Sequence, residues 1–464
     1  MIGSVVSNIQ SVVVFVAVLS VLIIVHEWGH FITAKRLGVD VKRFALGFGP
    51  TLFSKVYNGT TYMINAIPLG GYVKMAGDDR MECKGTSGEF YSKPIGHRSL
   101  VVLNGPVVNF LLAYISFIFV FMIGYPGQST TIAELVDGGP AQVAGLRAGD
   151  KIIAVDSREV HGWLNLQWKL EGENPKRVEI TVLRDGKETT LTVIPEITEK
   201  PNLVGRPRMI RDLGIDNMSN VIGGLVEEFP AENAGLQGGD RIIEIDNQEI
   251  TSWTDIKGAV ADSTGKQIVL KLVRDGQILV KAIKPRIDEH TDENGQTVKI
   301  RKIGIGPQQE LDLYKFGIWA SLVHSGEELV YITQLTYESL YQMVIGSKSA
   351  RESVTGPVGI FYIVKGAAQE GVSHLLFILG VISASLAIFN LLPVIPLDGG
   401  HLFLFGIEKV RGKPLPPKID EYIARLGFGL IILLALFVFY SDFSRFGWID
   451  NISGWFTQVR KMFP

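Results

Sequence analysis

The chain has 464 residues, a formal net charge of −2 at pH 7 and a hydrophobic content of 47%. This length exceeds one ordinary hydrophobic core, so we expect two to four domains. The mean hydropathy of +0.24 is high for a soluble protein, and the small net charge gives no reason to expect nucleic-acid binding. The single cysteine, Cys83, excludes an internal disulfide framework and has no metal-ligand neighbours in the sequence.

The first apolar stretch, about residues 9–32, carries a metal-binding motif. No charged residue occurs from 11 to 25, and the segment His26-Glu-Trp-Gly-His30 follows. On a helix, His26 and His30 lie at i and i+4 on one face, a spacing that lets two imidazoles bind one Zn²⁺. Glu27 beside them can act as general base toward an attacking water. Since no Lys or Arg precedes this stretch, we do not expect a cleavable signal peptide.

The apolar surroundings make this motif informative. An ionisable group within a membrane helix costs roughly 2.5–3.5 kcal/mol on insertion scales unless it is paired or bound to a metal. We therefore interpret the motif as a functional site. The alternative is the core helix of a soluble protein with two chance histidines, and a third ligand elsewhere in the chain would decide between these readings.

Four stretches are long and apolar enough to cross a membrane as helices. They lie at about 9–32, 100–123, 375–396 and 423–440. The fourth has a short purely apolar part, so a buried hairpin helix is the alternative there.

Basic residues predict the orientation of these helices. They gather after the first stretch, before the second, and between the third and fourth: Lys35, Arg36, Lys42, Arg43, Lys93, Arg98, Lys409, Arg411, Lys413 and Lys418. These clusters are predicted to be cytoplasmic, which leaves both termini and the long segment 124–374 outside. Arg445, Arg460 and Lys461 on the outer side run against the rule.

Residues 39–75 follow no helical pattern and are predicted to form a β-ribbon. Asn58-Gly59 stands between β-favouring residues, which is a strong hairpin signal. The segment is too apolar for a free loop, so we expect it to lean into the membrane beside the metal motif, where irregular backbone must be surrounded by protein or a cavity. The alternative is a surface hairpin packed on the helices.

The external segment contains an internal repeat. The fourteen-residue stretch Pro140–Ile153 matches Pro230–Ile243 at an offset of 90, and Arg184-Asp-Gly186 matches Arg274-Asp-Gly276. Each unit alternates short β-patterned runs with one helix. The unit resembles the PDZ domain in its permuted arrangement, which binds extended chain ends by adding a strand to a sheet edge. The alternative is a purely structural pair of spacers.

After the repeat, residues 311–343 show amphipathic helical spacing. We expect a helix that lies on the membrane surface or packs under the repeat, rather than a span. Gly356-Pro357 breaks the chain before it returns to the membrane.

The third membrane segment runs into Asn390-Leu-Leu-Pro-Val-Ile-Pro-Leu-Asp-Gly-Gly-His401. The predicted orientation puts Asp398 at the depth of His26 and His30, so it is our third ligand; two His and one Asp leave a position open for water, as in catalytic zinc sites. Asp398 could instead cap a helix, and His401 is an alternative ligand. Asn390 could hydrogen-bond a substrate backbone or satisfy a neighbouring helix. The same two interpretations apply to Asn109, where helix packing is favoured.

These motifs together resemble the site-2 protease family of intramembrane metalloproteases. The resemblance rests on H-E-x-x-H in the first membrane helix, N-x-x-P-x-x-x-L-D-G in the third and G-P-x-x-N in the second, and it covers nearly the whole chain. It implies that His26, His30 and Asp398 bind Zn²⁺ and that Glu27 is the catalytic base.

The resemblance also implies where substrate is held. The 39–75 ribbon would be a membrane-reentrant β-element, with Gly70, Gly71 and Tyr72 near its end as substrate-binding residues. Asn390 would match a residue credited with substrate handling.

The expected fold is a multi-pass α-helical membrane protein with four transmembrane helices, a membrane-reentrant β-hairpin and two tandem α+β PDZ domains. The expected boundaries are 1–35 for the first helix, 36–98 for the ribbon and a cytoplasmic loop, 99–124 for the second helix, 125–205 and 206–290 for the PDZ domains, 291–370 for an amphipathic helical region, 371–405 for the third helix with the Leu-Asp-Gly motif, and 406–464 for a cytoplasmic loop, the fourth helix and the tail.

The implied activity is hydrolysis of peptide bonds within transmembrane segments, in a bacterial inner membrane with the PDZ domains in the periplasm. The implied partners are membrane lipid and single-span proteins already trimmed by a site-1 protease, notably the anti-sigma factor RseA, together with remnant signal peptides. The PDZ pair would act as a filter. Two other classes remain open: a membrane-anchored PDZ adaptor without proteolytic activity, and a metal transporter lined by intramembrane His and Asp.

Overall fold

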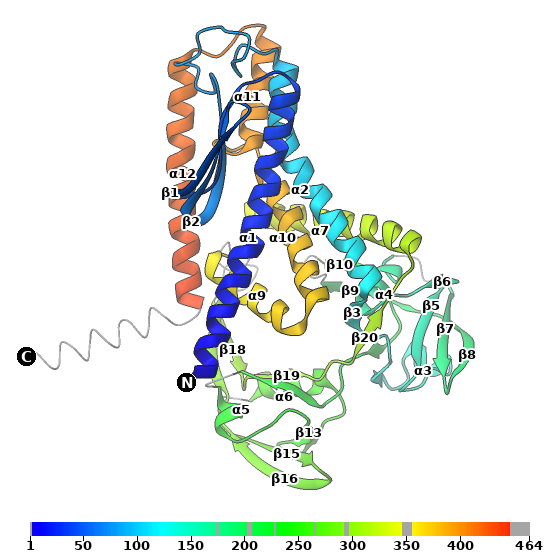
Figure 1. Ribbon diagram of the computed structural model, residues 1–464. Coiled ribbons are helices and arrows are strands. Elements are labelled where there is room, and N and C mark those ends of the chain that lie inside the picture. The colour runs from blue at the N-terminus through cyan, green and yellow to red at the C-terminus, as the bar shows by residue number, and fades with distance from the viewer. Residues whose placement is uncertain are drawn as a thin grey trace, which may run out of the picture. The chain divides into compact units, whose positions relative to one another are not determined.

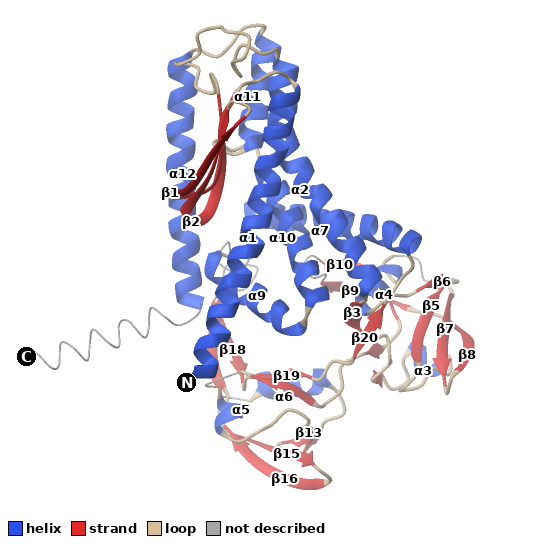
Figure 2. Cartoon of the chain, in the orientation of Figure 1, coloured by secondary structure: helices blue, strands red, loops and turns tan. Residues whose placement is uncertain are grey.

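The computed structural model describes residues 2–172, 176–201, 207–226, 229–263, 266–291, 297–345 and 355–445 (Figure 1). The chain forms two compact units, Met1–Gly124 with Lys315–Pro464, and Tyr125–Tyr314. The first unit is mainly helical and contains one long strand pair, whereas strands dominate the second (Figure 2). Each unit is described by itself.

All four predicted membrane segments are helices in the first unit: α1 (Ile2–Arg36), α2 (Ile95–Ile123), α10 (Val372–Asn390) and α12 (Pro417–Arg445). Their long apolar windows, at Ile9–Arg36, Ile95–Ile123, Val372–Asn390 and Lys418–Asp442, make them the four candidate spans of the described chain. The prediction of four apolar helices of membrane-crossing length is thus confirmed.

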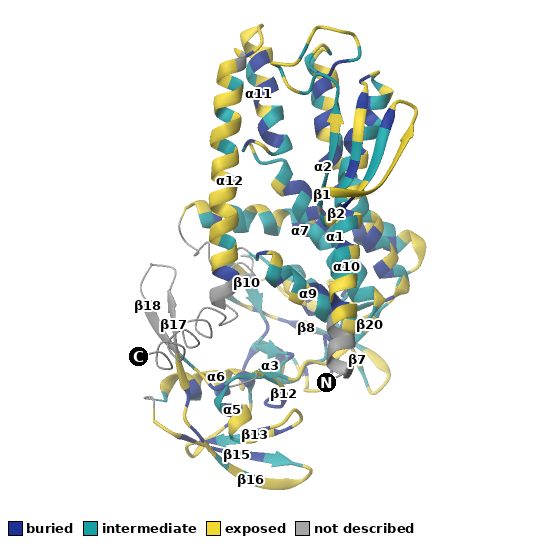
Figure 3. Ribbon diagram, turned by 60° about the vertical axis from the view of Figure 1, so that its left-hand side comes forward, coloured by how far each residue is buried: buried dark blue, intermediate teal, exposed yellow. Residues whose placement is uncertain are grey.

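Two of these helices differ from their predicted extents. Helix α10 ends at Asn390 rather than near residue 396, because Pro393 and Pro396 lack the N–H groups that would continue it. Helix α12 is one continuous helix whose described side chains are mostly exposed (Figure 3). The exposed side chains include Leu426, Leu433 and Leu436. This apolar surface suits contact with lipid and is not the buried hairpin that was the alternative.

Helix α2 is at the centre of the first unit. It packs against α1, α10, α7 (Ile318–Val344) and α11 (Asp398–Arg411). Phe117 of α2 is fully buried, and a Cβ at Gly380 of α10 would lie 2.6 Å from its ring. Ser383 of α10 donates a hydrogen bond of 2.8 Å to the carbonyl of Asn109. Small residues therefore let α10 approach α2 closely, as is usual between membrane helices.

Helix α9 (Pro357–Glu370) begins at the predicted Gly356-Pro357 break. Pro357 stands at the first helical position, where its missing N–H costs nothing. The carboxylate of Asp442 in α12 accepts hydrogen bonds from the backbone N–H groups of Gly356, Val358 and Gly359 at 3.0–3.1 Å. One side chain of α12 thus satisfies the free donors at the start of α9.

The predicted ribbon is the antiparallel pair β1 (Val41–Tyr57) and β2 (Thr60–Met75). Asn58 and Gly59 both have positive φ, 45° and 75°, as the hairpin signal requires. Gly47 and Gly49, at 81° and 83°, accompany shifts of register that bend β1. Both strands contact α1.

The amphipathic prediction for residues 311–343 is wrong at its start. Leu311–Tyr314 forms strand β20, which pairs with β3 (Tyr125–Gln128), and helix α7 begins only at Ile318. Leu311 and Leu313 fit the apolar spacing of the helix that follows, so the sequence pattern extends the helix over them. Pairing with β3, a strand far away in sequence, makes this segment a strand instead.

The second unit repeats one arrangement twice at the predicted offset of 90. Sheet order is β6-β5-β7-β8 in the first copy and β14-β13-β15-β16 in the second. The first copy comprises β4 (Glu134–Leu135), α3 (Pro140–Val143), β5 (Lys151–Val155), β6 (Arg158–Glu159), α4 (Trp163–Lys169), β7 (Val178–Arg184), β8 (Lys187–Val193), β9 (Glu196–Pro201), β10 (Pro207–Asp212) and β11 (Ile215–Asp216). The second comprises β12 (Ile222–Leu225), α5 (Pro230–Asn233), β13 (Arg241–Ile245), β14 (Gln248–Glu249), α6 (Trp253–Asp262), β15 (Ile268–Arg274), β16 (Gln277–Ile283), β17 (Arg286–Thr291), β18 (Thr297–Lys302) and β19 (Ile305–Pro307).

Each copy has its own hydrophobic core. The first core reaches Leu213 and the second reaches Ile303, beyond the expected limits at 205 and 290. The extra residues belong to the returning chain, since β11 pairs with β4 and β19 pairs with β12. Each copy is thus completed by a strand that lies C-terminal to the expected domain boundary.

The same buried ion pair occurs in both copies. Arg184 donates two hydrogen bonds to Asp150 at 2.7 Å, and Arg274 donates two to Asp240 at 2.6 and 2.7 Å. The two aspartates are almost fully buried. Burial opposes their ionisation, but the arginine and backbone N–H donors outweigh it, so the pKa of each carboxyl lies below its usual value.

Replacing both carboxylates, Asp150→Asn with Asp240→Asn, should destabilise the repeat at neutral pH. A lowered pKa means that the stabilisation is complete above the unfolded-state value of about 4 and is lost as pH falls below it. The wild-type chain should therefore lose protection in β7 and β15 on acidification below about pH 4, and the variant should show a smaller acid-dependent loss. Hydrogen exchange of the full chain measures this. The turn variant Asp185→Asn with Asp275→Asn is the matched control and should keep the wild-type profile.

Candidate metal centre and active site

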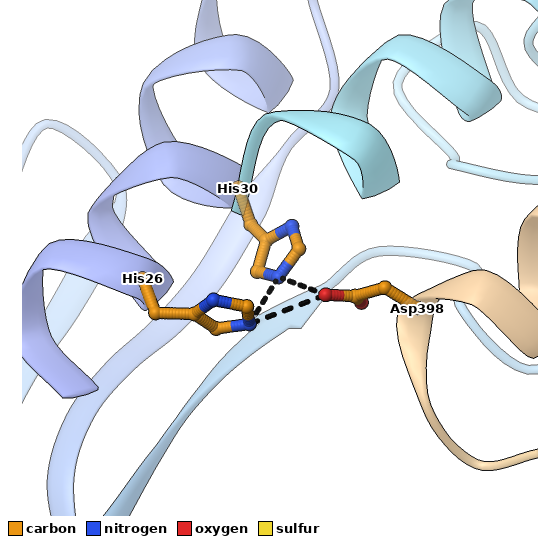
Figure 4. A group of neighbouring side chains, drawn as sticks. All are labelled: His26, His30 and Asp398. Carbon is orange, nitrogen blue, oxygen red and sulfur yellow. Dashed lines mark hydrogen bonds and ion pairs between the residues drawn. The ribbon is translucent and has the colours of Figure 1, made fainter. Parts of the chain in front are cut away.

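The three predicted ligands converge on one point (Figure 4). Nε2 of His26 and Nε2 of His30 are 3.2 Å apart, on successive turns of α1. Oδ2 of Asp398, at the first position of α11, lies 3.2 Å from the former and 3.4 Å from the latter. A ligand atom from each of the three residues lies within 4.8 Å of the other two.

The hydrogen bonds behind the rings indicate what this point can hold. Nδ1 of His30 lies 2.9 Å from the carbonyl of Val101, which can only accept, so Nδ1 carries the proton and Nε2 of the neutral ring is bare. Oδ2 of Asp398 is buried and has no hydrogen-bond donor. The bare Nε2 of His30 and the carboxylate oxygen thus face each other, and a bound cation satisfies both. The residues fit a metal ion with nitrogen and carboxylate ligands, which is the donor set of catalytic zinc.

Asn109 of α2 lies beside Nδ1 of the His26 ring. Its Nδ2 is 3.2 Å from Nδ1 of His26, and its fully buried Oδ1 has no partner. A half-turn of the amide exchanges these two atoms, and Oδ1 then accepts a hydrogen bond from Nδ1–H. In that arrangement both imidazoles present a bare Nε2 to the metal, each held by an acceptor on α2. The amide of Asn109 thus contacts a residue of the neighbouring helix, as its favoured interpretation expects, and that residue is a predicted metal ligand.

Two glycines allow α1 and α2 to approach this closely. A Cβ at Gly105 would lie 2.4 Å from the His30 ring and 2.9 Å from the His26 ring, and a Cβ at Gly29 would lie 2.4 Å from the carbonyl of Asn104. Real side chains do not tolerate such distances. Both positions therefore need glycine, within H-E-W-G-H and at the start of G-P-V-V-N.

Asp398 reaches the histidines because the chain folds back sharply after α10. A Cβ at Gly399 would lie 2.2 Å from the carbonyl of Leu391, and one at Gly400 would lie 2.6 Å from the nitrogen of Ile395. The N-cap of α11 is Leu397, so Asp398 is not the helix cap of the alternative interpretation. It occupies the first turn, where a helix dipole favours a carboxylate.

A cavity of about 350 Å³ opens beside the three ligands. Its lining includes Glu27, Tyr72, Asn390 and His401. His401 is therefore nearby, but it does not belong to the converging group.

The two predicted glycines lie at the edge of this region. A Cβ at Gly71 would lie 3.3 Å from Cγ of Glu27, so β2 runs directly over the predicted base. Gly70 has φ of 129° and lies against the ring of Phe48, which stacks on Tyr72 with centroids 6.2 Å apart. Neither glycine lines the cavity itself.

The fold and the site define a class: a membrane peptidase whose H-E-x-x-H helix and converging aspartate come from opposite ends of the chain. The model of peptidase family M50 matches residues 14–434. The chain belongs to this family, the site-2 proteases.

Named relatives extend over almost the whole chain. The regulator of sigma-E protease RseP of Escherichia coli K12 is 33% identical over 449 residues, covering 93% of this chain and 98% of the relative. RseP of Salmonella typhimurium is 31% identical, covering 95% and 99%. Among solved structures, the PDZ domain of an SdrC-like protein from Listeria innocua matches 20% of this chain and 97% of that domain, with 23% identity and a TM-score of 0.16.

Sequence reasoning missed the acceptors behind the histidines. The Val101 carbonyl has no side-chain signature, and Asn109 could have been found only by giving G-P-x-x-N a role in the site. Removing this amide while keeping its volume, as in Asn109→Leu, should weaken zinc affinity by about 10- to 100-fold, because His26 loses the acceptor that fixes its tautomer. Competition with a chelator measures the change.

The matched variant Asn109→Asp should retain affinity, since a carboxylate also accepts from Nδ1–H. The control Ser383→Ala removes a hydrogen bond from the same residue's main chain and should leave zinc affinity unchanged. Wild-type affinity in Asn109→Leu would exclude this positioning role.

Proposed function

We propose that this chain hydrolyses peptide bonds inside the transmembrane segments of other membrane proteins, with Zn²⁺ held by His26, His30 and Asp398. As a member of family M50 it is a zinc metalloprotease. The observation that carries the proposal is the convergence of two imidazole nitrogens and one carboxylate oxygen beside Glu27, with both histidines on a helix long and apolar enough to span a membrane.

The zinc ion and the protein would supply different parts of the hydrolysis. Bound zinc acts as a Lewis acid, which polarises a carbonyl and lowers the pKa of water. Glu27 takes a proton from the attacking water and delivers it to the leaving amine. Its place in the cavity between α1 and β2 brings the carboxylate to the ligand group and to the strand that would hold a substrate.

A membrane helix hides its peptide bonds in its own hydrogen bonds, so a substrate must be extended before cleavage. Strands β1 and β2 pair only with each other among the described strands. Residues 43–46 and 61–64 are paired on both sides, which leaves free edges along 51–57 and 71–74. Strand addition to one edge would hold a segment extended past Glu27. Exposed side chains along the ribbon, including Phe48, Phe53 and Ile64, would contact its apolar residues. Tyr72 and Asn390 in the cavity are the proposed substrate contacts, with Gly70 and Gly71 giving the strand its close approach.

The remaining proposals concern substrates and location. The relatives are named as regulators of sigma-E protease, and we infer the same type of role here: cleavage of a pre-trimmed anti-sigma factor like RseA, and of remnant signal peptides, after a site-1 protease. The bacterial relatives support a location in a bacterial inner membrane, and the charge distribution supports an orientation with both termini outside. The duplicated unit of residues 125–314 supports two tandem PDZ domains in the periplasm, and the apolar ribbon supports membrane re-entry.

Glu27→Gln should lower cleavage of a tagged, pre-trimmed single-span substrate by about 10²- to 10⁴-fold, the range for loss of a general base. Zinc content, measured by elemental analysis, should not change. Asp398→Asn should lose both zinc and activity, because it removes a ligand rather than the base. Undiminished cleavage by Glu27→Gln, or cleavage insensitive to a zinc chelator, would instead support the membrane-anchored PDZ adaptor.

The proposed PDZ filter can be deleted while the strand pair β3–β20, where the second unit begins and ends, is kept. Gln128 of β3 pairs with Leu311 of β20, so a short Gly-Ser linker can join them and replace residues 129–310. This deletion should allow cleavage of a substrate whose external domain has not been trimmed, which the full chain rejects. Adding Glu27→Gln to the deletion is the control and should abolish the new cleavage. Continued rejection by the deletion would mean that the filter lies elsewhere.

A further inference from the structure

A second, larger cavity of about 760 Å³ lies in the first unit. It is an open cavity lined by the loop between β2 and α2, the start of α2, and the turn from α11 into α12. Tyr91 is the only lining residue that it shares with the cavity beside the metal ligands. The peptidase chemistry uses none of its other lining side chains.

The lining is strongly basic. Five cationic side chains and one carboxylate line the cavity: Arg80, Lys84, Arg98, Lys409, Lys413 and Glu408. Glu408 is buried and binds both arginines, at 3.1 Å to Arg80 and 3.0 Å to Arg98. Arg80 also pairs with Asp420 at 2.9 Å.

Two carboxylates thus neutralise the two arginines. The three lysines have no side-chain hydrogen bond or ion pair within the described chain, so three positive charges face the cavity uncompensated. The nearby carboxylate of Glu89 is buried and accepts hydrogen bonds from the backbone N–H groups of Lys84, Gly85 and Thr86. It holds the loop in shape and does not line the cavity.

The basic wall is rigid where the arginines form it. The guanidinium of Arg80 lies 4.2 Å from the centroid of the Tyr91 ring, and that of Arg98 lies 4.8 Å from Phe405. Stacking and the shared carboxylate fix both planar groups before any ligand arrives. Gly85 and Gly412 at the rim have nothing within 4 Å of where a Cβ would stand, so their backbone is open to a ligand.

The position of the cavity identifies its ligand. Ile95 and Lys418 are the first residues of two candidate spans, so the cavity lies where two helices enter the membrane. Apolar side chains are exposed at the same level, at Val410, Ile419 and Tyr422, and continue along α12. Cations at the level of the helix ends, above an apolar helix surface, match a phosphate headgroup with its acyl chains.

We propose that this cavity binds the phosphate-bearing headgroup of an anionic phospholipid, in the leaflet that the charge distribution predicts to be cytoplasmic. The three lysines neutralise the phosphate, and the arginine wall orients it. The acyl chains lie along the exposed face of α12. A soluble phosphate compound could bind the same cations, but it has no acyl chain to contact the exposed apolar side chains of α12. This inference does not depend on peptidase activity.

The test uses the full-length protein in mixed micelles that contain either phosphatidylglycerol or phosphatidylcholine. The wild-type chain should retain phosphatidylglycerol selectively in native mass spectrometry. Lys84→Gln, Lys409→Gln and Lys413→Gln together should weaken that retention at least tenfold, since each basic residue near an anionic headgroup contributes to binding. The variant replaces exposed side chains, and its size-exclusion profile checks that it is folded.

The matched control, Lys42→Gln, Arg43→Gln and Lys93→Gln, removes the same charge from residues on the same predicted side that do not line the cavity. It should retain lipid like the wild type. Equal retention by the two triple variants would overturn the cavity as the lipid site. Saturable binding of inorganic phosphate or glycerol 3-phosphate that abolishes any preference for phosphatidylglycerol would show a soluble ligand and overturn the lipid proposal.

Discussion

The structure depends on three electron-pair donors brought together inside an apolar layer. Two imidazole nitrogens and one carboxylate oxygen meet at 3.2–3.4 Å, where water is scarce and each charge is costly. A bound metal ion makes that arrangement favourable. The surrounding fold has two tasks that follow from this constraint: to keep the three atoms together, and to admit a peptide beside them. Helix α2 performs the first, and the proposed function gives the second to the ribbon over Glu27.

Local patterns were sufficient to predict much of this architecture. H-E-x-x-H needs only helical periodicity to bring His26 and His30 together, and Asn58-Gly59 needs only its preference for positive φ to make the turn. The four apolar helices and the repeat at an offset of 90 can also be predicted from local sequence. Asp398 required one more step, because its depth had to be inferred from the basic residues at the helix ends. The two prolines before it indicated that the chain turns there.

Other features depend on partners far away in sequence and could not be predicted. Leu311–Tyr314 is a strand because Tyr125–Gln128 lies beside it, and each repeat closes with a strand beyond its expected limit. No one-dimensional pattern tells which residue of the neighbouring helix the Asn109 amide meets. The basic cavity combines a loop, a helix start and a turn more than 300 residues apart in sequence, as in the pair Arg80 and Glu408. Tertiary contacts of this kind have no local signature.

The contact between Gly105 and the two imidazoles also limits how α1 and α2 can move against each other. A Cβ at this position would lie 2.4 Å from the His30 ring and 2.9 Å from the His26 ring, so the α2 backbone lies directly beside both rings. Sliding of either helix toward the other would press this backbone against a ring. The spacing of the two helices and the position of the two imidazoles are therefore coupled. A change that separates the helices would also displace the ligand atoms, even if it lay far from them in the sequence.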